Sequence, residues 1–292
     1  TLGTFETLSR PLQDGMGEAG VRPGLVYSVD DLSRARRRSE SHPELVRRIL
    51  DDAERTLSSP DLLAVAGGID LHRHKLDRLV EAHLVRPQER YESAILQLLR
   101  AYGQAPREGG WVAEAHMVHQ PGSPYSQFPQ MQCDHCSANT AAAMTLAMEA
   151  LGEALPVEDE EYISHQIYER CLRHFLKHCE DRSAFWAQRD HQFNWRIMTC
   201  GDAGLAALGL KGIPDRERMV EFALEGVADI LDRLPAEGDW EEGPGYWAGT
   251  LYLGLRFGLA LRRATDGRVD LFQHPALAAT ADYFNHVILP GG

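Results

Sequence analysis

The sequence has 292 residues, of which 43% are hydrophobic, and a formal net charge of -13. The charge disfavours nucleic acid as a partner, because phosphate binding needs a basic surface. No apolar run approaches the roughly 18 residues that a membrane span needs, and five cysteines give no disulfide framework.

Helical spacing of apolar residues dominates most of the chain. Residues 1–30 lack it and are expected to be irregular, whereas 31–292 are expected to form one helical domain. Pro43 suits the first position of a helix, and Gly103 and Gly152 suit helix ends. In chain order, the expected helices cover 43–57, 91–102, 137–151, 160–179, 197–210, 216–234, 250–264 and 275–288.

The order and composition of these helices predict the fold class. The helix over 197–210 is rich in glycine and alanine, so we expect it to pack closely between its neighbours. Strand-like alternation is nearly absent, and glycine and proline cluster between the apolar stripes. Helices joined by alternately short and long loops suggest pairs in a curved array. The sequence therefore predicts an all-α domain of antiparallel helix pairs.

A long loop over 106–136 has no clear periodicity, and loops of this length tend to be functional. Its Trp111 and Tyr125 offer faces on which a sugar can stack. We therefore interpret His116 and His119 as substrate contacts, with a metal-binding pair as the alternative.

Cys133 and Cys136, with His135 between them, raise the possibility of a zinc site. The site would need a second pair of ligands, and the spacing to the available residues matches no standard zinc finger. Buried thiols are the simpler interpretation. The available residues are Cys171, His174, His178 and Cys179.

Two segments carry the groups best suited to chemistry. The first collects polar and aromatic side chains just before the small-residue helix, and a helix N-terminus favours anions. The alternative is that Asn194 caps the helix and Trp195 packs in the core. The residues of this segment are Arg189, His191, Asn194, Trp195 and Arg196.

The second segment covers 239–247. Its Gly-Pro-Gly sequence favours a tight, non-helical turn that would present Tyr246 at a fixed angle, flanked by Trp240 and Trp247. An ordinary interhelical turn is the alternative. Glu241 and Glu242 are adjacent and point in different directions, so they do not make the carboxylate pair of a glycosidase.

Together the two segments resemble the helical toroid domain of the heparinase II/III-like polysaccharide lyases. The matching text is Asn194-Trp195, the small-residue stretch 200–208 and the string 240–247. A weaker helical resemblance extends over most of the chain from about residue 26. It implies an incomplete (α/α) toroid with a long cleft, followed in full-length relatives by a β-sandwich domain. The chain ends about where such a toroid ends, so we expect the sandwich to be absent from it.

The resemblance also implies an activity and a periplasmic or secreted location. Relatives cleave acidic polysaccharides by β-elimination: the uronate carboxylate is neutralised, the C5 proton is removed and the 4-O-glycosidic bond breaks. Asn194 resembles the neutralising asparagine, and Tyr246 resembles the catalytic tyrosine. His191 would take the place of the residue that neighbours the asparagine.

Further roles follow from the same resemblance. Tyrosine has an unperturbed pKa of about 10, so a Tyr246 base would need nearby positive charge, which Arg189, Arg196 or His191 would supply. Relatives also use a His or Tyr from the sandwich domain. No cofactor is implied, and a divalent metal stays open. The expected substrate contacts are Arg189, Trp195, Arg196, Trp240, Glu242, Trp247, His116 and His119.

Some alternatives remain at this point. Many relatives have Asn-His or Asn-Asn where this chain has Phe193-Asn194 or Asn194-Trp195, so the register of the neutralising pair is open by one residue. The other function classes are a glycoside hydrolase on a similar helical toroid and a non-catalytic, carbohydrate-binding helical scaffold.

Overall fold

The computed structural model describes residues 20–21, 24–64, 69–105, 111–112, 131–188 and 193–287. This part of the chain is almost entirely helical, which confirms the prediction of an all-α protein. A π-helical turn, Tyr168–Leu172, joins α8 to α9 and divides the single helix expected over 160–179. The long helices are α2 (Val29–Ser41), α3 (Pro43–Leu57), α4 (Ile69–Val85), α5 (Glu89–Gln104), α7 (His135–Leu151), α8 (Val157–Ile167), α9 (Arg173–Asp181), α10 (Phe193–Gly209), α11 (Arg216–Arg233), α12 (Pro244–Ala264) and α13 (Pro275–Val287).

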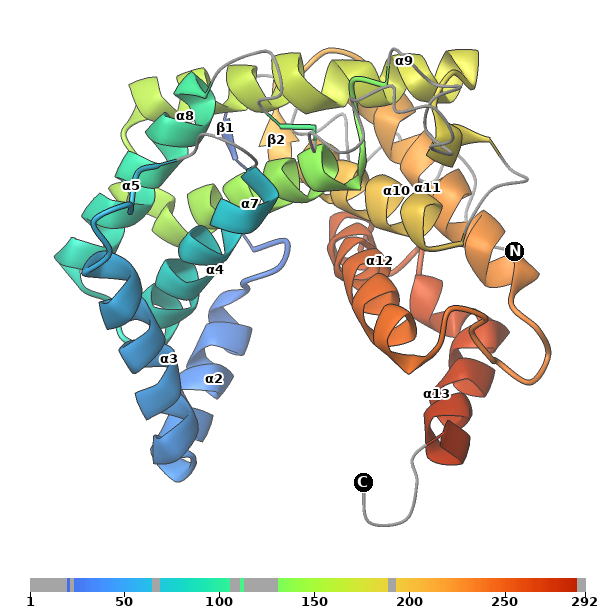
Figure 1. Cartoon of the computed structure of the whole chain (residues 1–292), viewed down its shortest axis with the longest axis horizontal. Helices are drawn as coiled ribbons and strands as arrows, with labels where there is room; N and C mark the ends of the chain where they lie inside the picture. Colours follow the sequence, from blue (N-terminus) through green and yellow to red (C-terminus); the bar gives the residue numbers. More distant parts are fainter. Residues whose placement is uncertain are drawn as a thin grey trace.

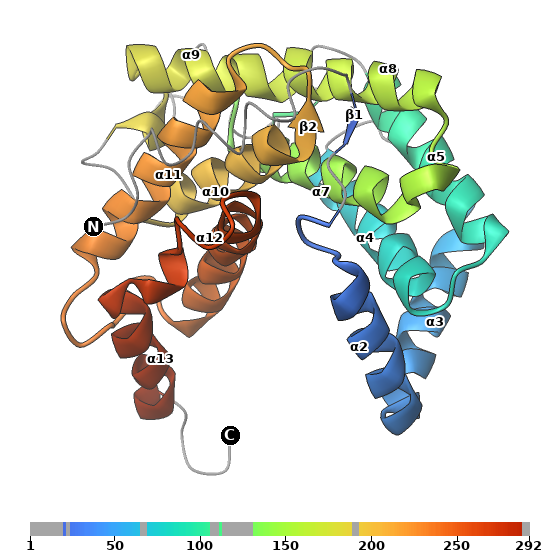
Figure 2. The same cartoon turned by 180° about the vertical axis from the view of Figure 1, so that it is seen from behind.

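The helices form an arch (Figure 1). Helices α2 and α3 form one leg, α12 and α13 form the other, and α8 with α9 runs across the top. Figure 2 shows the same arch from behind. Two strands of two residues each, β1 (Gly20–Val21) and β2 (Leu210–Lys211), pair antiparallel. This pairing connects Gly20 and Val21, which lie in the segment expected to be irregular, to the end of α10.

Helices α7 and α10 form the centre of the arch. Helix α4 packs on α7, α7 packs on α10, and α10 packs on both α11 and α12. Almost every residue of α7 from Cys136 to Met148 is buried. Asp134 caps this helix, because its carboxylate accepts the backbone N–H of Ser137 at 2.7 Å. A helix whose residues are apolar or small on all sides is buried among other helices.

Glycine allows α10 and α12 to approach closely, as the small-residue sequence predicted. A Cβ atom on Gly201 would lie 3.0 Å from the Cα atom of Gly254 on α12. A Cβ atom on Gly204 would lie 2.5 Å from the Cβ atom of Ala223 and 2.7 Å from the Phe257 ring. Gly201 therefore packs against the backbone of α12, and Gly204 leaves room for Ala223 of α11 and Phe257 of α12.

Gly204→Ala tests this contact. We expect the variant to lose about 1–3 kcal/mol of unfolding free energy, because the added methyl group overpacks the interface. The matched control is Gly249→Ala on α12, where an added Cβ atom meets nothing within 4 Å. That variant should be neutral or slightly more stable, since alanine favours helix. Urea denaturation measures both, and equal stability of the two variants would contradict the close packing.

Several local predictions were wrong. The Gly-Pro-Gly sequence was expected to form a tight, non-helical turn that presents Tyr246, but Gly243, with a φ of 86°, caps α12, and Pro244 and Gly245 lie in its first turn. Proline suits that position because it has no N–H to leave unsatisfied. Helix α7 begins at His135, inside the expected loop. Helices α2 and α4 were not predicted, and α2 buries none of its residues.

Candidate functional site

A cavity of about 550 Å³ is lined mainly by residues of α4, α7 and α12, with Met198 from α10. Tyr246 is among the lining residues. It lies in the first turn of α12, and 56% of its surface is exposed. A larger hollow of about 1040 Å³ is lined by residues of α11, α13 and the segments next to them, and it contains none of the predicted site residues.

Asn194 lies at the start of α10 and is buried, with 5% of its surface exposed. Its Oδ1 atom accepts the backbone N–H of Trp195 at 2.6 Å. Met198, one helical turn further on, lines the cavity. Asn194 itself is not among the described residues that line the cavity.

Glu242 connects the two segments that the sequence singled out. Its carboxylate accepts the indole N–H of Trp240 at 3.1 Å and the backbone N–H of Asn194. Partial burial raises the pKa of Glu242, and the charge of Glu241 raises it further. The carboxylate therefore ties the segment before α12 to the N-terminus of α10, where a negative charge suits the unpaired N–H groups.

Trp195 and Arg196 lie inside the protein. The Trp195 ring packs edge-on against His135, with centroids 4.4 Å apart, and against Phe185 at 5.6 Å. The guanidinium of Arg196 pairs with Asp229, with Nε and Oδ2 3.0 Å apart. It also donates to backbone carbonyl groups before α10. These contacts hold the start of α10 in place.

The two other predicted tryptophans anchor the start of α12. Trp240 is buried, and its carbonyl oxygen accepts the hydroxyl of Tyr283 at 3.5 Å. The indole N–H of Trp247 donates to Thr280 at 2.7 Å, and the ring packs against Tyr283 with centroids 6.3 Å apart. Both rings therefore attach this segment to α13.

The remaining predicted site residues lie outside the described residues: His116, His119, Arg189 and His191. Trp111, in the same expected loop as His116 and His119, is described. It is buried, and its indole N–H donates to the carbonyl oxygen of Tyr102 at 3.2 Å. Its ring packs within the fold rather than presenting a face to a sugar.

The sequence reasoning missed a polar network beneath the cavity. Asp202, fully buried on α10, accepts the side-chain amide of Asn139 at 2.7 Å and the guanidinium of Arg256 at 2.8 Å. The Arg256 guanidinium also lies over the ring of Tyr252, 5.1 Å from its centroid. The sequence signal that could have pointed to this network was the presence of Asn139 and Asp202 in helices composed largely of small and apolar residues.

A second feature that the sequence did not reveal is the acidic side of the cavity. Asp52 of α3 and Asp77 and Glu81 of α4 line it. Burial raises the pKa of the Glu81 carboxyl, and the charges of Asp77 and Asp52 raise it further. A carboxyl group that is partly desolvated beside other acids is a frequent feature of binding and catalytic sites.

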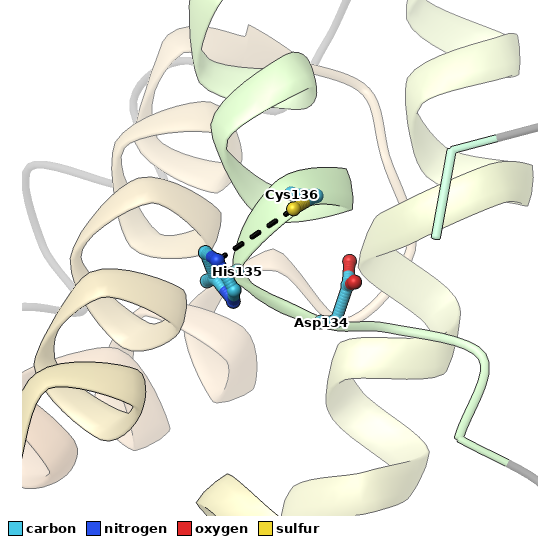
Figure 3. A group of neighbouring side chains, drawn as sticks. All are labelled: Asp134, His135 and Cys136. Carbon is cyan, nitrogen blue, oxygen red and sulfur yellow. Dashed lines mark hydrogen bonds between the residues drawn. The ribbon is translucent and has the colours of Figure 1, made fainter. Parts of the chain in front are cut away.

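The group most like a metal centre in the described part of the chain is Asp134, His135 and Cys136, whose donor atoms lie within 4.8 Å of one another (Figure 3). The Cys136 sulfur lies 3.6 Å from Nε2 of His135. However, the Asp134 carboxylate is occupied in capping α7, and the His135 ring packs against Trp195. Packing at the helix N-terminus explains the group without a metal.

Three of the other ligands considered for zinc, Cys133, Cys171 and His178, have partners of their own. Cys133 and Cys171 are both buried, with their sulfur atoms 3.8 Å apart. Nε2 of His178 accepts the backbone N–H of Gln132 at 3.0 Å, and its Nδ1 lies 2.9 Å from the Ser183 hydroxyl. His178 therefore fixes the segment that leads into α7.

This role of His178 predicts a dependence of stability on pH. Burial lowers the pKa of His178 from 6.5 to about 4. The unfolded chain takes up a proton below pH 6.5 and the folded chain does not, so stability is complete above that pH and is lost as pH falls toward 4. We expect His178 to account for a loss of about 2 kcal/mol between pH 7 and pH 4.5.

Urea denaturation of the wild type and of His178→Gln at the two pH values measures this contribution. The variant should be less stable at pH 7 and less dependent on pH. Equal losses in the two proteins would show that His178 does not titrate as its burial requires.

No protein-family model matches the chain, and no curated protein matches it. Within the described residues, every helix is too short or too polar to cross a lipid bilayer.

Proposed function

We propose that this chain is the helical domain of a polysaccharide lyase, an incomplete (α/α) toroid that cleaves a uronate-containing polysaccharide by β-elimination. One observation carries the proposal. Glu242 connects the segment that leads to Tyr246 with the backbone of Asn194, so the two segments with the lyase-like sequence are in contact, and Tyr246 of the second segment lines a cavity.

Each group has a defined part in the proposed reaction. Asn194 neutralises the uronate carboxylate, which lowers the energy of the charge that develops when C5 loses its proton. The C–H electron pair forms the C4–C5 double bond, and the C4–O4 bond breaks. Tyr246 protonates the departing oxygen as general acid and, when ionised, also removes the C5 proton.

The buried residues support this site rather than contact the substrate. Arg196 is paired with Asp229, and it is not among the described residues that line the cavity. We expect the catalytic His or Tyr that relatives take from a β-sandwich domain to come from such a domain here as well.

The acids of α4 do not favour the hydrolase alternative. Asp77 and Glu81 are four residues apart and therefore lie on one side of the same helix. A glycosidase needs two carboxyl groups that flank the scissile bond. Two acids on one wall suit substrate binding better than bond cleavage.

An ultraviolet absorbance assay against a panel of uronate polysaccharides tests the proposal. Elimination leaves an unsaturated uronate that absorbs, so growth of absorbance with one polymer would support a lyase. New reducing ends without absorbance would point to a hydrolase. Binding without either product would point to a carbohydrate-binding scaffold.

A further inference from the structure

The charged side chains that line the cavity affect which kind of uronate chain can bind there. Asp52, Asp77 and Glu81 line the α3 and α4 side, whereas the cations among the described lining residues are Arg78, Arg256 and, when protonated, His74. Because α4 packs on α7 and α12 packs on α10, the carboxylates approach the cavity from the side away from Tyr246. A ligand there contacts acids on one side and aromatic hydroxyl groups on the other.

The positive charge of Arg256 is already compensated. Its guanidinium is paired with buried Asp202, and the charge of Asp77 also acts on it. Sulfate groups are bound strongly by arginines that are free to form bidentate contacts. Only 15% of the Arg256 side chain is exposed, so it offers little free surface to a row of sulfates.

The cavity also offers acceptors, on α4, and a ring face, on α12. Ionised Asp77 and Glu81 accept hydrogen bonds and donate none, so they suit the hydroxyl groups of a sugar. Tyr252 is 62% exposed beside Arg256, and its ring offers an apolar face for a pyranose. A sulfate in the same place would meet the two carboxylates, with Arg78 as the one arginine that α4 contributes to the described lining residues.

We infer that this cavity selects an unsulfated uronate oligosaccharide, with Asp77 and Glu81 accepting the hydroxyl groups of the sugar next to the uronate. The inference rests on the proposed function for the uronate itself. It adds that α4 excludes sulfated chains by charge repulsion, so the acidic wall and not Tyr246 determines the preference.

The test compares binding of two probes to the Tyr246→Phe chain, in which turnover is blocked. One probe is an oligosaccharide of alternating glucuronate and N-acetylglucosamine, and the other is the same backbone carrying N-sulfate groups. Calorimetry at low salt should show about tenfold weaker binding of the sulfated probe, since like charges at short range are costly there.

Removing the two acids should remove the preference. Asp77→Asn combined with Glu81→Gln is expected to bring the two affinities within about threefold, mainly by tighter binding of the sulfated probe. The matched control, Glu158→Gln with Glu161→Gln, makes the same change in net charge on the exposed face of α8. It should leave the preference unchanged. Circular dichroism and thermal melts confirm that each variant is folded.

The outcomes separate this inference from the proposed function. Binding that favours the unsulfated probe, lost only in the α4 variant, supports the inference even if no polymer yields an absorbing product, which would refute the lyase. Elimination that is as fast on the sulfated chain refutes the inference and keeps the lyase. Binding of neither probe, or an equal effect of the α8 control, overturns the inference.

Discussion

Tyr246→Phe is expected to lower kcat for elimination by at least about a hundredfold, the usual contribution of a general acid or base. The substitution removes one oxygen atom from a side chain that is largely exposed. Stability should therefore change by less than about 0.5 kcal/mol, as at most surface positions. The affinity for an uncleaved oligosaccharide should stay within about threefold, because the phenyl ring still lines the cavity.

Tyr252→Phe is the matched control for this result. Tyr252 lies on the same helix, is similarly exposed and lines the same cavity, so its hydroxyl is equally available to a ligand. We expect this variant to change KM and to leave kcat nearly intact. Initial rates by absorbance and Kd by calorimetry measure both. A Tyr246→Phe enzyme that retains its kcat would remove Tyr246 from the mechanism.

Asp202→Ala is expected to have the largest effect on stability, a loss of about 3–5 kcal/mol of unfolding free energy. Asp202 is buried and pairs with Arg256 across 2.8 Å. Its removal leaves a guanidinium, with 15% of its side chain exposed, without its counter-charge. The side-chain amide of Asn139 also loses the acceptor that it reaches at 2.7 Å.

Two further variants make this prediction specific. Glu44→Ala breaks an exposed pair with Arg47 on α3 and should cost less than about 0.5 kcal/mol. Adding Arg256→Met to Asp202→Ala should recover part of the loss, because no charge then remains buried. Urea denaturation measures all three. A loss in Asp202→Ala as small as that in Glu44→Ala would mean that the network does not hold α10 against α12.

The helices at the centre of the arch were predictable because their sequences are extreme. The small residues of α10 favour close packing between helices, and the structure places Gly201 and Gly204 at such contacts. Helix α4 was missed because charged residues recur along it and blur the apolar stripe. The start of α12 was missed because Pro244 was interpreted as part of a turn rather than as the first residue of a helix.

The site was predictable only in part, for a related reason. Local sequence patterns single out Asn194 and Tyr246 as candidates, because both lie in distinctive stretches of the sequence. The contact between Asn139 and Asp202 joins residues 63 positions apart, and no local pattern reports such a pair. The same holds for the acids of α4, which face the cavity only once α4 packs on α7.

The proposed function requires that the glycosidic bond breaks by elimination and not by hydrolysis. The most direct test is mass spectrometry of products formed in water enriched in heavy oxygen, with an unsulfated uronate polysaccharide as the substrate. Elimination adds no water, so the account predicts unsaturated products without the heavy isotope, and none with Tyr246→Phe. Saturated products that carry the isotope would contradict it.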